Sequence, residues 1–113
     1  MRRYCLALDL NDDAELIKAY EVYHQRVWPG ILQSLMDAGI IHLDIYRVRD
    51  RMFMIMEVDD EFSFEKKAIM DQGNPLVQEW EELMWTFQKP FPWAKQGEKW
   101  VLMDNIFSFS SKP

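Results

Sequence analysis

The chain has 113 residues, and its 13 Lys and Arg against 19 Asp and Glu give a net charge of −6. This length fits one globular domain, which we expect to span residues 1–113. Nucleic acid and anionic membrane surfaces require a basic face on their protein partner, so the acidic balance argues against both. No apolar run approaches the length of a membrane span or resembles a secretory signal, which predicts a cytoplasmic protein.

A strand followed by a helical stretch is predicted at the start of the chain. Residues 3–8 are apolar and partly aromatic, and the polar residues after them can cap a helix. From about Asp13 to Asp37, apolar residues recur at a spacing close to 3.6, which predicts a helix. Pro29 lies inside this stretch and should kink the helix or start a second helical piece, and Gly39 should close it.

The middle of the chain has the pattern of a β-hairpin. Residues 40–48 and 52–58 are rich in β-branched, aromatic and methionine side chains, and three charged residues separate the two runs. The second run is apolar at nearly every position, so we expect both of its faces to be covered.

Helical patterns return over residues 61–70 and 75–87, the second with Asn74 as its N-cap. Residues 100–109 then have the composition of a last strand.

The resulting order, β-α-β-β-α-β, is that of an α+β, ferredoxin-like fold, in which helices cover one face of an antiparallel sheet. The other face of such a sheet is left open in a single chain. Because the strand over residues 52–58 is apolar on both faces, we expect a second copy to cover that open face, and hence a homodimer.

Two histidines are the candidates for proton transfer near pH 7, because the ordinary imidazole pKa lies there. His24 follows Tyr20 by four residues and lies on the side of the apolar stripe, where it is either a core histidine bonded to a backbone carbonyl or an acid/base group. His42 opens a strand, and we expect it to be a surface or structural residue. Neither histidine has a His or Cys at metal-ligand spacing and the glycines are isolated, so we expect no metal and no cofactor.

Trp80 lies on the apolar side of the predicted helix over residues 75–87. Its indole can fill the core or can stack on the C–H face of a sugar, and the pattern does not separate these two roles. The neighbouring glutamates are expected to form a solvated face. They are Glu79, Glu81 and Glu82.

The run Tyr20-Glu21-Val22-Tyr23-His24-Gln25-Arg26-Val27-Trp28-Pro29, with Gly39 and Ile45-Tyr46 after it, resembles the L-rhamnose mutarotase family, whose members show a Tyr, a His four residues later and a Trp-Pro. Later segments are similar to the branch of that family described as L-fucose mutarotases. These segments are Phe62-Ser63-Phe64-Glu65, Asn74-Pro75, Gln78-Glu79-Trp80-Glu81, Leu83-Met84-Trp85 and Gly97-Glu98-Lys99-Trp100.

The resemblance implies a dimeric α/β barrel and an isomerase that acts on a monosaccharide. Such an enzyme interconverts the α and β anomers of a 6-deoxy-L-sugar, here L-fucose or otherwise L-rhamnose, by acid/base ring opening without a cofactor. The resemblance also implies that His24 is the proton donor, that Tyr20 contacts the sugar and that Trp80 forms a stacking wall.

Two positions depart from the rhamnose-type pattern. Leu43 stands where those members carry a tyrosine, and Glu79 replaces the first tryptophan of a pair. Tyr46 is a candidate to replace the missing phenol as a substrate-binding residue. Glu79 supplies either a carboxylate for a sugar hydroxyl or only a surface charge.

Two other functions stay open at this point. One is a cofactor-free monooxygenase or isomerase of the dimeric α/β barrel type, which would consume oxygen with a quinol-like substrate. The other is a non-enzymatic small-ligand-binding module, which would bind a sugar without accelerating its anomer exchange.

Overall fold

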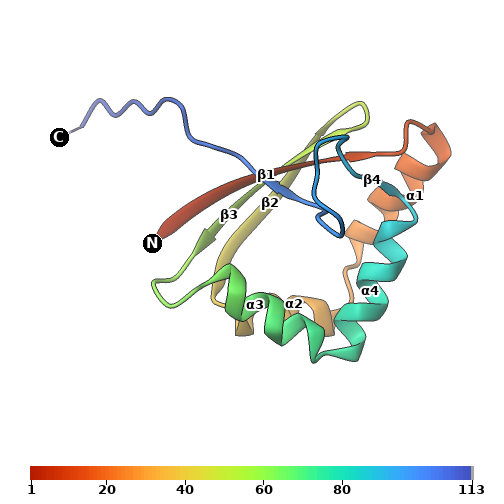
Figure 1. The fold of residues 1–113 in the computed structure, drawn as a ribbon, viewed down its shortest axis with the longest axis horizontal. Coiled ribbons are helices and arrows are strands. Elements are labelled where there is room, and N and C mark those ends of the chain that lie inside the picture. The colour runs from red at the N-terminus through yellow and green to blue at the C-terminus, as the bar shows by residue number, and fades with distance from the viewer. Residues whose placement is uncertain (113) are drawn as a thin grey trace.

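Residues 1–112, which the computed structural model describes, form a five-stranded antiparallel sheet and four helices (Figure 1). The strands are β1 (Arg2–Leu10), β2 (Ile40–Val48), β3 (Arg51–Val58), β4 (Gln88–Lys89) and β5 (Val101–Leu102). Their order is β2-β3-β1-β4, and β5 also pairs with β1. The α+β class, the antiparallel sheet and the hairpin are therefore confirmed.

The four helices come in two consecutive pairs. They are α1 (Ala14–Gln25), α2 (Pro29–Asp37), α3 (Phe64–Gln72) and α4 (Pro75–Trp85). As predicted, the first helical stretch is interrupted before Pro29. Trp28 has φ −56° and ψ 133°, because a residue before proline is driven out of the helical region, and the proline ring is accepted in the first turn of the next helix.

Asp13 and Asn74 cap two of these helices. The side-chain oxygen of each accepts hydrogen bonds from two backbone N–H groups in the first turn that follows it. Gly39 closes α2 with φ 93°, where a Cβ atom would lie 2.6 Å from the Asp59 carboxylate. Both the backbone conformation and the close carboxylate favour glycine at this position.

The helix-facing side of the sheet carries the core. On β1 and β3 the residues that are buried alternate along the strand, which is the pattern of a sheet covered on one face. They are Leu6, Leu8, Leu10, Met52, Met56 and Val58. With residues of the helices they form two clusters, the first around Leu8, Tyr20 and Trp80 and the second around Val58 and Phe62.

The opposite side of the sheet, called here the open face, has no helix on it. Direct pairing of Ala7 with Phe53 and of Tyr46 with Phe53 places these three side chains on that face. Phe53 is half-buried, whereas Tyr46 and Val48 are 59% and 74% exposed. The prediction of one helix-covered and one open face is thus confirmed.

Three predicted elements have other bounds in the structure. The helix predicted over residues 61–70 is α3, which begins at Phe64 because the Ser63 side chain caps it by accepting from the Lys66 N–H. The helix predicted over residues 75–87 ends at Trp85, and β4 follows it because Leu10 of β1 pairs with Gln88. The strand predicted over residues 100–109 is limited to Val101–Leu102. β-Branched and aromatic residues favour a strand only where there is a surface to pack on. The backbone N–H of Met103 still donates to the Cys5 carbonyl of β1 at 2.8 Å, and residues 104–112 then leave the body of the chain (Figure 1).

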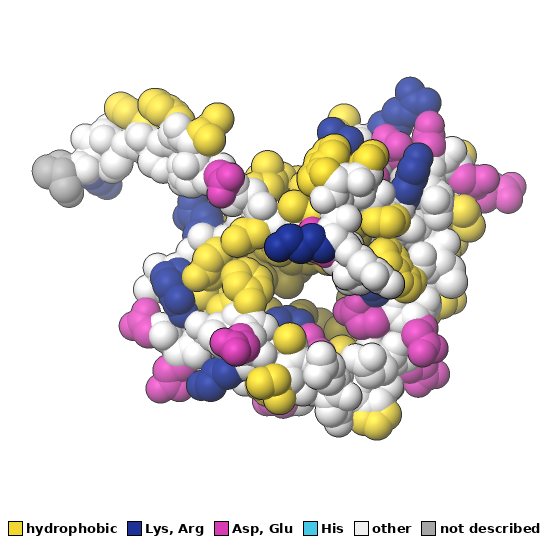
Figure 2. Space-filling model, in the orientation of Figure 1, with side chains coloured by type: hydrophobic (Ala, Val, Ile, Leu, Met, Phe, Trp, Pro, Cys, Tyr) yellow, Lys and Arg dark blue, Asp and Glu magenta, His cyan; other side chains and the backbone are white. Residues whose placement is uncertain are grey.

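The C-terminal segment therefore projects with its apolar side chains uncovered, visible as yellow atoms along the projection in Figure 2. Ile106 is 94% exposed, and Phe107 and Phe109 are each 79% exposed. None of the helices over residues 1–112 is long and apolar enough to cross a bilayer.

Candidate active site

The last turn of α1 brings two of the predicted site residues into contact. The helical period turns Tyr20 into the core, where it is 4% exposed, and leaves His24 half-buried one turn later. His24 Nδ1 lies 2.8 Å from the Tyr20 carbonyl oxygen. A carbonyl oxygen only accepts, so in the neutral imidazole Nδ1 carries the proton and Nε2 carries the lone pair. Among residues 1–112, Nε2 has no hydrogen-bond partner.

Two aromatic rings border this imidazole, and two more pack on one of them. The ring centroids of His24 and Tyr20 are 4.4 Å apart, and those of His24 and Trp80 are 5.6 Å apart. Trp28, in the linker between α1 and α2, packs edge-on against Trp80 at 5.0 Å, and Tyr23 lies 6.5 Å from the same indole. The structure thus brings Tyr20, His24 and Trp80 together.

Trp80 is both a core residue and a neighbour of the imidazole. It is 7% exposed and belongs to the first core cluster. The core role of Trp80 is therefore confirmed, and the role of its indole in stacking on a sugar stays a prediction.

The Tyr20 hydroxyl has one partner in the described chain, Gln88. Gln88 Nε2 lies 3.3 Å from the phenol oxygen and donates to it. Burial raises the pKa of Tyr20 to about 12, against a smaller opposing effect of the Gln88 hydrogen bond. Tyr20 is therefore neutral at physiological pH, where it can donate or accept a hydrogen bond but cannot act as a base.

The structure does not bring the remaining candidates to this cluster. Tyr46 lies on the open face, because adjacent strand residues alternate between faces and its neighbour Ile45 points toward the helices. Glu79 is exposed on α4, which fits a surface charge. Leu43 is half-buried against the second core cluster, and His42 is exposed, as expected.

Gln88, Trp28 and Tyr23 also contact this cluster, although the sequence pattern did not identify them as site residues. For Trp28 the sequence indicated only that it lies between two helices, because a residue directly before a proline is driven out of the helical region. Gln88 gave no local signal, since its burial depends on the pairing of β4 with β1.

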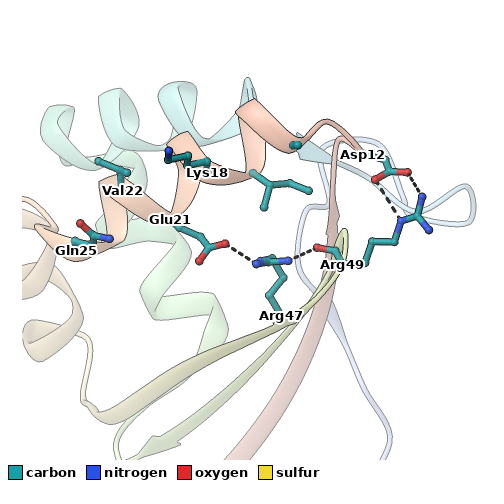
Figure 3. A pocket seen from close by; sticks show the side chains of 9 residues that line it. Asp12, Lys18, Glu21, Val22, Gln25, Arg47 and Arg49 are labelled. Atoms are coloured by element: carbon teal, nitrogen blue, oxygen red, sulfur yellow. Dashed lines mark hydrogen bonds and ion pairs between the residues drawn. The ribbon is translucent and has the colours of Figure 1, made fainter.

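A separate groove of about 520 Å³ lies between α1 and the end of β2 (Figure 3). Its two arginines are each paired with a carboxylate: Arg47 with Glu21 at 2.6 Å and Arg49 with Asp12 at 3.0 Å. The third cation that lines the groove, Lys18, forms no ion pair among residues 1–112. The groove does not contain His24, Tyr20 or Trp80. Within residues 1–112, no three His, Cys, Asp or Glu side chains gather closely enough to hold a metal ion.

The chemistry of the aromatic cluster suits a neutral ligand with both apolar and hydroxyl groups. Flat rings offer stacking surfaces for C–H groups, and a neutral phenol offers a hydrogen bond. An imidazole with one nitrogen held by the backbone and the other uncommitted can take up and release a proton. Figure 2 shows the molecule hollowed between the sheet and the helices.

Comparison with known proteins supports this interpretation. The family model for L-rhamnose mutarotase matches residues 3–109. A protein from Xanthomonas campestris pv. campestris named L-fucose mutarotase is 46% identical over 112 residues, covering 97% of this chain and 90% of that protein.

Two solved structures share the fold. A crystal structure of an L-rhamnose mutarotase from Formosa agariphila is 18% identical with a TM-score of 0.72, covering 97% of this chain and all of that one. A dimeric ferredoxin-like protein from an uncultured marine organism is 19% identical with a TM-score of 0.54, covering 96% and 91% of the two chains. The match of the family model over nearly the whole sequence, together with the 46% identical relative, shows that the chain belongs to the L-rhamnose mutarotase family.

Proposed function

We propose that this mutarotase interconverts the α and β anomers of a 6-deoxy-L-sugar and that it prefers L-fucose to L-rhamnose. One observation carries the catalytic part of the proposal. His24 is held at Nδ1 by the Tyr20 carbonyl at 2.8 Å, and its Nε2 is left uncommitted beside the Trp80 ring.

In the proposed reaction, protonated His24 donates its Nε2 proton to the ring oxygen of the sugar while the anomeric hydroxyl releases its proton to water. The bond between C1 and the ring oxygen breaks, and C1 becomes an aldehyde. Rotation about the C1–C2 bond exposes the other face of the aldehyde. The sugar hydroxyl then adds to that face, its proton returns to His24, and the new anomeric oxygen takes a proton from water, so that no atom is gained or lost.

Tyr20 and Trp80 position the sugar in this proposal. The neutral Tyr20 hydroxyl donates a hydrogen bond to a sugar oxygen, which its raised pKa permits over the whole physiological range. Trp80 supplies an apolar surface for the C–H groups of the ring. Neither side chain exchanges a proton with the substrate in the course of the reaction.

The substrate preference rests on Leu43 and on the relative named L-fucose mutarotase. The two sugars both carry a methyl group at C6 and differ in the configuration of their ring hydroxyls, so polar groups must distinguish them. Leu43 removes a phenol that rhamnose-type members carry at this position, and its half-buried side chain packs on the core. Loss of one hydrogen-bonding partner changes relative affinity by roughly 1 to 3 kcal/mol, or about 5- to 150-fold.

Saturation-transfer NMR of the anomeric protons, with both sugars at equal enzyme concentration, tests this proposal. We expect faster catalysed exchange for L-fucose by at least about fivefold. Equal rates, or faster exchange of L-rhamnose, would contradict the preference. Binding of either sugar without any accelerated exchange would instead favour a ligand-binding module.

We also propose that the protein works as a homodimer whose copies pack through the open face, forming a dimeric α/β barrel. Support comes from the half-buried Phe53 and Ile55 and from the exposed Tyr46 and Val48 on that face. One of the similar structures is described as dimeric. Light scattering at micromolar concentration should give twice the chain mass of 13.6 kDa, and a monomer at that concentration would contradict the assembly.

A further inference from the structure

Gln88 is the one buried polar or charged residue among residues 1–112. It lies on β4 opposite Leu10 and directly after Phe87, both members of the first core cluster, and it is 7% exposed. The side chains around it, Leu10, Phe87 and Tyr20, are apolar except for the Tyr20 hydroxyl. A glutamine in such surroundings is unusual, because polar side chains are mostly found at the surface.

Only one of the two polar atoms of the Gln88 amide has a hydrogen-bond partner in the described chain. Nε2 donates to the Tyr20 hydroxyl oxygen at 3.3 Å, while Oε1 is buried without a partner in the described chain. A buried carbonyl without a hydrogen bond is destabilising, and a methionine or leucine of similar volume would avoid that cost. Stability alone therefore does not account for an amide at this position.

The hydrogen bond from Gln88 restricts the direction in which the Tyr20 hydroxyl can point its proton. A hydroxyl has one proton to donate and two lone pairs, and Gln88 Nε2 occupies one lone pair of the Tyr20 oxygen. Two donors repel each other, so the hydroxyl proton of Tyr20 must point away from the Gln88 nitrogen. The 3.3 Å separation is at the long end for a hydrogen bond, and such contacts in unliganded sites commonly shorten when a substrate binds.

We propose that Gln88 is a positioning residue, which holds the Tyr20 hydroxyl so that its proton is donated to a sugar oxygen. This inference rests on the proposed function, because it needs Tyr20 to contact the substrate. Gln88 itself acts through Tyr20 and does not touch the sugar.

The first test is a double-mutant cycle on the catalysed exchange of L-fucose. Gln88→Met should lower kcat/KM by about 2- to 12-fold, which is the range of one net hydrogen bond, while leaving the unfolding midpoint unchanged or higher. In the Tyr20→Phe background the same substitution should have no further effect, because the hydroxyl it positions is already absent. Gln72→Met, at an exposed glutamine on α3, is the matched control and should leave the rate unchanged.

A merely structural role would give a different result. It would lower the rate equally in both backgrounds, or lower the midpoint of unfolding along with the rate. Either result, or full activity in folded Gln88→Met, would overturn the proposal.

The second test needs no substrate and no Gln88 variant. In the wild-type protein, the side-chain amide protons of Gln88 should show an NMR chemical shift that changes in Tyr20→Phe, whereas those of Gln72 should not. Unchanged Gln88 resonances would show that the contact is absent and would overturn the positioning role. Wild-type protein that lacks exchange activity on both sugars, with the amide contact present, would overturn the proposed function, and the positioning role would fall with it.

Discussion

Replacement of His24 by alanine tests the proposed chemistry most directly. The substitution removes the imidazole and leaves the Tyr20 carbonyl within its helix. Among the described residues, no second imidazole lies in the aromatic cluster, because His42 is exposed on β2. We therefore expect the catalysed exchange of anomers to fall close to the spontaneous rate.

For His24→Ala, the expected increase in the activation free energy is larger than the expected decrease in the free energy of unfolding. A positioned proton-transfer group contributes typically about 10²- to 10⁴-fold, which corresponds to roughly 2.7 to 5.4 kcal/mol of the activation barrier. On the stability side, His24 loses contacts with the Tyr20 and Trp80 rings, each worth about 0.5 to 1.5 kcal/mol. A cost of this size leaves a typical domain folded, since folding stabilities are about 5 to 15 kcal/mol.

The assay is saturation-transfer NMR of the anomeric protons of L-fucose, combined with a denaturant titration of each variant. His42→Ala is the matched control, because it removes the other histidine from an exposed position. We expect the control to keep its rate, and added imidazole to restore part of the activity of His24→Ala through the space left by the ring. If exchange by His24→Ala stays within a few-fold of wild type, another group transfers the proton and the reasoning is wrong.

Three further predictions concern the core and the phenol. Tyr20→Phe should lower kcat/KM by about 2- to 12-fold, the range of one net hydrogen bond, and a loss as large as that of His24→Ala would make Tyr20 the proton-transfer group. The folded-state pKa of Tyr20 is raised from 10.0 to about 12, so its contribution to stability is complete below pH 10 and is lost as pH rises toward 12. Denaturant titrations should show the wild-type free energy of unfolding falling by roughly 2 to 3 kcal/mol more than that of Tyr20→Phe over this interval, and parallel curves would contradict it. Replacing Leu8, which is 0% exposed, by alanine should lower the free energy of unfolding by about 2 to 5 kcal/mol. Calorimetry should show no such loss for Met36→Ala, at a side chain on α2 that is 66% exposed.

The helical part of the site could be predicted because it is local. Tyr20 and His24 are one turn apart on a helix with a clear apolar stripe, so their shared orientation follows from the helical period. Trp80 could be placed on the inner side of its helix by the same reasoning. The hydrophobic periodicity did not predict that these two helices contact each other. That expectation came from the resemblance to a family.

The residues that were missed depend on contacts between distant parts of the chain. Gln88 is buried because β4 pairs with β1, 78 positions earlier at Leu10, and no local pattern around Gln88 indicates that pairing. For Tyr46, strand alternation shows that it and Ile45 face opposite sides but does not show which side the helices cover. The residues after Leu102 have strand-forming composition, yet after the hydrogen bond from Met103 to Cys5 they turn away from β1 instead of pairing with it.

The open face and the projecting C-terminal segment have a consequence for how the stability of this protein is measured. Apolar surface that is buried only on dimerisation stabilises the folded state by mass action. Its contribution to the free energy of unfolding therefore increases with protein concentration. The unfolding midpoint of the proposed dimer should therefore rise with total protein concentration. A thermal midpoint or a variant's change in stability is comparable between laboratories only at a stated concentration, and strong dilution should shift any marginal variant toward the unfolded or aggregated state.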